Sequence, residues 1–178
     1  MQVSATPFWT TFGAIYYSAV FLGCTWAALD HARDLARDQP RQVVSAGAKR
    51  TSDDPLIQKE FGELWIKGEA ALGYFDRVIA ELQEGWDNRR NLTEEGRGLL
   101  AVKTLGLRTF TSAVALEVTP RIYDFAGGRM TGSEYGLDRF WRDARMLTMH
   151  DPMIYSTRIV GDYGLNDKVV IFPSRFTS

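Results

Sequence analysis

The sequence is poor in the residues that build disulfides and metal sites. Cys24 is the only cysteine among 178 residues, so no disulfide can form within the chain. With only two histidines besides, the chain has too few thiol and imidazole groups for a zinc site made from the protein alone. The apolar run around Cys24 favours a small core residue there. A reducing, cytoplasmic setting fits a chain without disulfides.

An excess of charge of one sign is also missing. The formal net charge is -1, from 21 basic and 22 acidic residues. The chain as a whole therefore offers no electrostatic footprint for a nucleic acid or an anionic membrane. With 45% hydrophobic and 24% charged residues, the composition is that of an ordinary globular protein. We expect one domain over residues 1–178, with no nucleic-acid partner.

The first 29 residues contain no charged side chain. The segment 8–29 is long enough to span a bilayer, but Thr, Ser, Gly and Ala residues interrupt it. No basic segment precedes it, so a signal peptide is not predicted. The helical pattern also continues into the charged stretch 30–34. We therefore expect a fully buried central helix rather than a membrane span.

The alternation typical of a half-buried strand is absent, and helical spacing dominates the chain. Asp54-Pro55 is a typical helix start, because aspartate caps free amides and proline suits the first helical position. Thr93, followed by two glutamates, is another. The fold class predicted is all-α: an antiparallel four-helix bundle with a short extra helix and an extended C-terminal tail. The expected helices cover about 8–37, 54–84, 93–125, 132–149 and 151–166.

Residues 135–152, Y-G-L-D-R-F-W-R-D-A-R-M-L-T-M-H-D-P, are the most informative segment. Helical spacing predicts that its apolar stripe is buried, and that two i,i+4 ion pairs form on the outer face. The expected pairs are Asp138 with Arg142 and Arg139 with Asp143. Arg145 has no acid at that spacing, so another helix, a subunit or an anionic ligand is its expected partner. The predicted buried stripe consists of Leu137, Phe140, Trp141, Ala144 and Leu147 or Thr148.

This segment ends in His150-Asp151-Pro152. A helix C-terminus favours a protonated histidine, so His150 has a structural role as a cap beside any functional one. Asp151 likewise has a structural role as the cap of the following helix. Chemistry alone leaves these alternatives open and describes a helical bundle of undefined purpose.

Residues 127–145 resemble the pattern G-G … E-Y-x-x-x-R-x-x-R-D-A-R of the C-terminal helical domain of acyl-CoA dehydrogenases. The stretch R-F-W-R-D-A-R, followed by H-D-P, is closer to one branch of that fold. That branch comprises flavin-dependent monooxygenases of the dibenzothiophene monooxygenase and hydroxyphenylacetate hydroxylase types. The resemblance implies a bundle at the core of a dimer or tetramer, with flavin held between this bundle, a β-domain and a neighbouring subunit.

The resemblance also implies roles for particular residues. His150 and Asp151 would lie near the flavin ring, with His150 as proton donor or hydrogen-bond partner. Arg41 and Arg129 would bind the flavin phosphate, for which the bidentate guanidinium is suited. Ser133 would add a hydroxyl at a helix N-terminus. FMN is expected rather than FAD, because this branch usually takes reduced flavin from a separate reductase.

The sequence departs from the family pattern in three respects. The dehydrogenases carry a glutamate after this helix, whereas Leu147-Thr148-Met149-His150 supplies no carboxylate base. An extra histidine that often precedes His150 by three positions is replaced by Leu147. The resemblance also matches residues 1–178 to the family's C-terminal bundle alone, without its N-terminal helical domain and β-domain. The alternatives are therefore an enzyme completed by another chain, a non-catalytic oligomerisation module, and an acyl-CoA dehydrogenase-like fragment.

Overall fold

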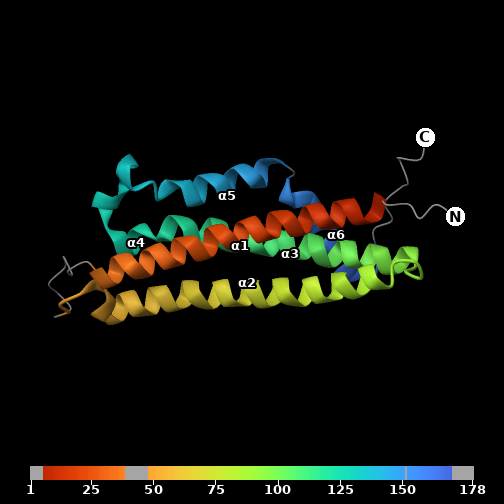
Figure 1. The fold of residues 1–178 in the computed structure, drawn as a ribbon, viewed down its shortest axis with the longest axis horizontal. Helices are drawn as coiled ribbons and strands as arrows, with labels where there is room; N and C mark the ends of the chain where they lie inside the picture. The colour runs from red at the N-terminus through yellow and green to blue at the C-terminus, as the bar shows by residue number, and fades with distance from the viewer. Residues whose placement is uncertain (1–5, 39–47, 151, 170–178) are drawn as a thin grey trace.

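The computed structural model describes residues 6–38, 48–150 and 152–169, with the backbone alone at 6–10, 126 and 129. Within these ranges the regular elements are helices and no strand occurs. Three long helices form the body: α1 (Thr6–Asp38), α2 (Pro55–Asp87) and α3 (Glu94–Arg121). They run lengthwise beside one another and alternate in direction (Figure 1). The predicted all-α bundle is therefore confirmed.

Two shorter helices complete the bundle. These are α5 (Asp138–His150) and α6 (Met153–Asn166). Helix α3 packs against α1, α2, α5 and α6, whereas α1 packs against α2, α3 and α5. Figure 1 shows α5 on the side of the bundle away from α2. The centre of the bundle is therefore α3.

The two predicted helix starts form as expected. The Asp54 carboxylate accepts a hydrogen bond from the amide of Leu56 at 2.9 Å, and Pro55 is the first residue of α2. A short 3₁₀ turn, η2 (Thr51–Asp53), leads into this cap. The Thr93 hydroxyl accepts from the amide of Gly96 at 3.0 Å. Both caps satisfy amides that a helix leaves without an internal partner.

The end of α2 corrects the prediction of a turn beginning at Gly85. The helix continues to Asp87, and Gly85 is buried inside it. A β-carbon at Gly85 would lie 2.5 Å from Cδ1 of Leu100 on α3. This glycine therefore serves close helix packing, and the chain turns only after Asp87.

The segment after α3 is less regular than predicted. A separate turn, α4 (Tyr123–Ala126), follows α3, and Gly127 ends it with φ 75°. Two 3₁₀ turns come next, η3 (Gly128–Thr131) and η4 (Ser133–Tyr135). The helix expected from residue 132 begins only at Asp138. Gly136, at φ 58°, adopts the left-handed conformation that glycine tolerates best, and it separates η4 from α5.

Helix α1 is buried along one face only, which corrects the expectation of a fully buried helix. Phe12 is 43% exposed and Tyr16 is 67% exposed, whereas Phe21 and Leu29 have no exposed surface. By length and hydropathy, α1 and the segment 94–125 would each suffice to cross a membrane. Both pack in the bundle, and core helices of soluble proteins meet the same criterion. The main core cluster joins α1, α2, α3 and α5, and includes Leu29, Leu64, Val118, Ile122 and Phe140.

Candidate functional site

Helix α5 presents one apolar face to the bundle and so fixes the position of its last residue, His150. Phe140, Ala144 and Thr148 are buried at spacings of four residues, which places them on one side of the helix. Leu147 is half-buried beside them. Trp141 was predicted in this stripe, but it is 44% exposed and lies off the buried face. The other predicted stripe residues lie on the side that faces α1 and α3.

The outer face of α5 carries one of the two predicted ion pairs. Arg142 pairs with Asp138 at 2.7 Å. Arg139 instead lies over the ring of Phe140, with its guanidinium carbon 4.9 Å from the ring centroid, so the predicted pair with Asp143 is wrong. Arg145 has no acidic partner among the described residues and donates to the Thr148 hydroxyl at 3.2 Å. These arginines are explained by contacts within α5.

His150 is tied to the first helix of the chain. Its Nδ1 lies 3.2 Å from the hydroxyl oxygen of Tyr17 on α1. The two rings are tilted at 43°, with centroids 5.6 Å apart. Within the described part of the chain, Nε2 of His150 has no hydrogen-bond partner, and the residue is exposed. One nitrogen is therefore anchored, and the other is available to a ligand.

Arg108 on α3 contacts the Tyr17 ring of this pair. It is only 3% exposed, and its guanidinium carbon lies 5.0 Å from the centroid of the Tyr17 ring. This is within the distance of a cation–π contact. Neither Tyr17 nor Arg108 was singled out from the sequence. The available signal in the sequence was an arginine at a core position of α3, between Leu107 and Thr111, where a charged side chain is not expected.

An apolar cluster supports the Tyr17–His150 contact. It is built on Phe21, Ala115 and Ala144, which are fully buried and come from α1, α3 and α5. Cys24 lies at its edge, half-buried rather than fully enclosed as the sequence suggested. Burial, aided by the negative charge of Asp143, raises the pKa of the Cys24 thiol. The thiol therefore stays protonated near neutral pH. Half-buried side chains packed against this cluster are Tyr17, Cys24, Leu116, Leu147 and Met153.

The remaining predicted site residues are not gathered around His150. Ser133 is exposed in η4, and Arg129 belongs to η3. Both turns precede α5, whose thirteen residues span about 20 Å at 1.5 Å per residue. Ser133 thus precedes the start of α5, whereas His150 is its last residue. The two ends of α5 are well separated in Figure 1. Arg41 and Asp151 lie outside the described residues.

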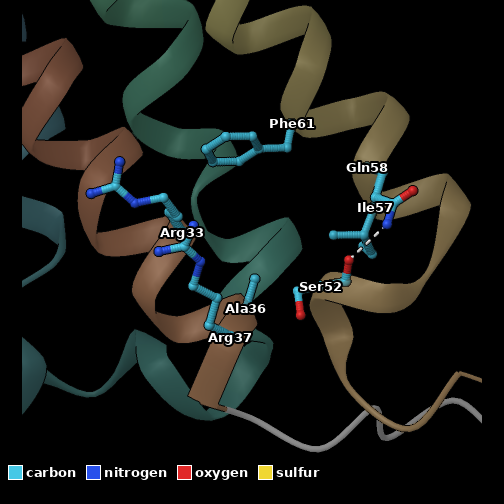
Figure 2. A pocket seen from close by; sticks show the side chains of 7 residues that line it. All are labelled: Arg33, Ala36, Arg37, Ser52, Ile57, Gln58 and Phe61. Atoms are coloured by element: carbon cyan, nitrogen blue, oxygen red, sulfur yellow. Dashed lines mark hydrogen bonds between the residues drawn. The ribbon is translucent and has the colours of Figure 1, made fainter.

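A pocket of about 200 Å³ lies where the end of α1 meets the start of α2. Figure 2 shows Arg33 and Arg37, one helical turn apart on α1, across from Ile57 and Phe61 on α2. Arg33 is paired with Asp30 at 2.9 Å. The side-chain amide of Gln58 donates to the carbonyl of Ser52 and closes one side. The pocket is basic on one wall and apolar on the other, and the sequence reasoning did not identify it.

Comparison with known proteins identifies the family to which this helical bundle belongs. A family model described as "Acyl-CoA dehydrogenase, C-terminal domain" matches residues 15–154, which is most of the chain. The chain belongs to the acyl-CoA dehydrogenase C-terminal domain family. This confirms the resemblance seen in residues 127–145.

Individual relatives indicate which branch of this family the chain is similar to. Dibenzothiophene monooxygenase of Mycolicibacterium goodii is 38% identical over 157 residues, which cover 88% of this chain and 38% of that protein. A probable FMNH2-dependent monooxygenase of Pseudomonas putida is 29% identical over 154 residues, 86% of this chain and 39% of that protein. The relatives are thus monooxygenases of the acyl-CoA dehydrogenase fold, as the sequence indicated.

Solved structures of monooxygenases share the fold of this chain. The FMN-bound dibenzothiophene monooxygenase of Paenibacillus sp. A11-2 superposes with a TM-score of 0.87 at 31% identity, over 93% of this chain and 41% of that one. Methanesulfinate monooxygenase of Pseudomonas fluorescens gives 0.87 at 29% identity, over 92% and 42%. The chain therefore spans about two fifths of the length of the relatives that it matches.

Proposed function

We propose that this chain forms the C-terminal helical part of a flavin-dependent monooxygenase that uses reduced FMN and O2. The observation that carries the proposal is His150: it ends the motif-bearing helix α5, it is anchored through Nδ1, and it leaves Nε2 accessible. The relatives support the cofactor, because one is named FMNH2-dependent and another has been solved with FMN. Bound FMN, once reduced, supplies the electrons with which O2 is activated.

The residues of this chain fit such a cofactor. An accessible imidazole nitrogen beside a packed apolar cluster suits a hydrogen bond to, or proton transfer at, an oxygen held near the flavin ring. Positions 147–150 at the end of α5, where a dehydrogenase would carry its glutamate base, hold Leu147, Thr148, Met149 and His150 and supply no carboxylate. The proposal therefore assigns His150 to oxygen chemistry rather than to abstraction of a carbon-bound proton. Asp151 is proposed to assist His150 in this chemistry.

The phosphate contacts are proposed at the other end of α5. Arg129 and Ser133 lie in the turns before that helix, and Arg41 follows the end of α1 by three residues. A single flavin would reach both ends only by lying along α5. The alternative is that a neighbouring subunit supplies the phosphate contacts, as the family fold implies. The second arrangement requires groups beyond the helical bundle of one chain.

Assembly is part of the proposal. Several large apolar side chains near the junction of α5 and α6 are exposed, which favours burial against another surface. We propose a dimer or tetramer formed through the bundle, a β-domain supplied by the same or another chain, and a flavin reductase as the source of reduced FMN. The protein is proposed to be soluble and cytoplasmic. The exposed side chains near this junction are Met149, Ile154 and Tyr155, and Trp141 is exposed in the first turn of α5.

Flavin retention and turnover test the proposal together. The complete protein, with any chain that supplies the β-domain, is mixed with FMN and passed over a gel-filtration column. We expect FMN to stay bound at micromolar concentration, and His150→Ala to lower product formation by about 10²–10⁴-fold while FMN stays bound. His31→Gln is the matched control, since His31 hydrogen-bonds to the Ala27 carbonyl of its own helix and its ring contacts Phe140, 5.2 Å away between ring centroids, rather than Tyr17 or His150. Loss of FMN from the wild-type protein would refute the proposal.

A second function is favoured by the share of the relatives that the chain spans, about two fifths. It is a helical assembly module without catalysis. This alternative predicts a stable oligomer whose mass, measured by light scattering, is unchanged by FMN and by His150→Ala. A fall in flavin-dependent activity on that substitution would exclude it.

A further inference from the structure

We propose that Tyr17 is a positioning residue that holds His150 in the tautomer with its proton on Nε2. The Tyr17 hydroxyl donates to Nδ1, so that Nε2–H becomes the donor directed away from the bundle. The role of that donor toward a flavin-bound oxygen rests on the function proposed above. The tautomer itself does not, and it can be measured without flavin.

The first argument is the hydrogen-bond inventory. In a neutral imidazole one nitrogen is a donor and the other an acceptor, and the bond made by one nitrogen sets the state of the other. The Tyr17 oxygen lies 3.2 Å from Nδ1. Among the residues that the structure describes, this is the only acceptor within reach of the Tyr17 hydroxyl proton. The reverse direction would make Nδ1 the donor and leave that proton without a protein acceptor.

The second argument is that Tyr17 itself is held firmly. Its ring packs against the Phe21, Ala115 and Ala144 cluster. The buried Arg108 lies over one face at 5.0 Å, and the Tyr16 ring meets it edge-on at 5.8 Å. A hydroxyl carried by a restrained ring gives a directional bond, whereas a mobile partner would not fix an exposed histidine.

The third argument is the position of His150 at the last residue of α5. Residues at a helix end lose part of the backbone restraint that the interior keeps. The bond to Tyr17 joins α5 to α1 across 133 positions of sequence and replaces that restraint. His150 can therefore be both exposed to a ligand and fixed in orientation, which is the combination that a proton donor needs.

The test uses the complete chain and nitrogen-15 spectra of its histidine rings. There are only two histidines, so His31→Gln assigns the His150 signals. With neutral imidazole, we expect Nδ1 of His150 to give the unprotonated resonance and Nε2 the protonated one. Tyr17→Phe keeps the ring against Arg108 and removes only the hydroxyl oxygen. We expect it to produce a mixture of both tautomers.

Tyr16→Phe is the matched control, because Tyr16 is the adjacent tyrosine, 67% exposed, and its hydroxyl has no partner among the described residues. This variant should leave the His150 spectrum unchanged. A wild-type spectrum with the proton on Nδ1, or a Tyr17→Phe spectrum identical to the wild type, would overturn the assignment. Circular dichroism of each variant checks that the bundle is folded. A further variant, Tyr17→Gln, replaces the hydroxyl donor with an amide donor and should partly restore the Nε2–H tautomer.

In the flavin-loaded protein, Tyr17→Phe should lower kcat by about tenfold with KM and FMN retention unchanged, as expected when one hydrogen bond that orients a proton donor is lost. If the tautomer shifts but wild-type protein retains no FMN, the positioning role stands and the proposed function fails. If FMN binds and turnover occurs but Tyr17→Phe leaves both tautomer and kcat unchanged, the positioning role fails and the function stands.

Discussion

Truncation of Phe21 tests whether the small apolar cluster of Phe21, Ala115 and Ala144 contributes to the stability of the bundle. Phe21 has no exposed surface and lies where α1, α3 and α5 meet. Phe21→Ala removes a whole ring from a packed interior, which costs about 3–5 kcal/mol when the cavity does not collapse. With a denaturant slope of about 2 kcal/mol per molar in urea, the unfolding midpoint should fall by about 1.5–2.5 M.

The matched control is Phe110→Ala on α3. The same atoms are removed there, but Phe110 is 39% exposed and touches Tyr74 at 6.0 Å between ring centroids. We expect a midpoint shift of less than about 0.7 M, since little buried area is lost. Urea unfolding followed by circular dichroism measures both variants. Equal shifts, or a shift below about 0.7 M for Phe21→Ala, would refute the assignment of Phe21 to a packed interior. A concentration-dependent shift for Phe110→Ala would instead reveal a subunit interface.

Three further changes probe the caps, the turns and the thiol. Asp54→Ala removes the cap of α2 and should cost about 1–2 kcal/mol by urea unfolding, whereas Asp54→Asn, which keeps an acceptor oxygen, should cost less than half as much. Gly127→Ala forces a side chain onto a backbone with φ 75° and should lower stability by about 1–3 kcal/mol, while Gly128→Ala, with open space around it, should change it by less than about 0.5 kcal/mol. Because burial raises the pKa of Cys24, fewer thiolates are present at pH 8 than for a free cysteine. Its reaction with an aromatic disulfide reagent should therefore be slower than that of free cysteine at pH 8 and should accelerate on unfolding in urea.

Local signals in the sequence predicted the elements well where a side chain acts on its own backbone. Asp54 and Thr93 cap the helices they precede, because capping depends only on residues two or three positions apart. The same signals failed where packing decides. The expected helix over 54–84 ends before Gly85, whereas this glycine lies inside the helix and is required by the approach of Leu100 from another helix, which no local pattern shows. Trp141 fitted the predicted stripe, yet the buried face of α5 is narrower than the spacing alone indicated.

The site was predicted only in part for the same reason. His150 was found because it ends a recognisable motif, and the structure confirms its place at the end of α5. Its partner Tyr17 could not be found, because periodicity indicates which face of α1 is buried but not which helix covers it. Arg108 left a weaker trace, a charged residue at core spacing in α3. Such a residue predicts a buried polar contact without naming the partner.

These contacts also explain how His150, the residue proposed to act on the flavin-bound oxygen, can be held in place on the outside of a helical bundle. An exposed side chain at a helix end is normally free to change rotamer, and that freedom costs about 0.5–1.5 kcal/mol when a ligand must fix it. Here part of that restraint is already in place: Ala144 and Thr148 seat α5, Tyr17 holds Nδ1, and Arg108 restrains the Tyr17 ring. With the tautomer proposed above, a ligand at Nε2 would meet a donor whose direction is set before binding. The packed side of the bundle thus contributes to the proposed site, although Tyr17 is the one residue hydrogen-bonded to His150 in the part of the chain that the structure describes.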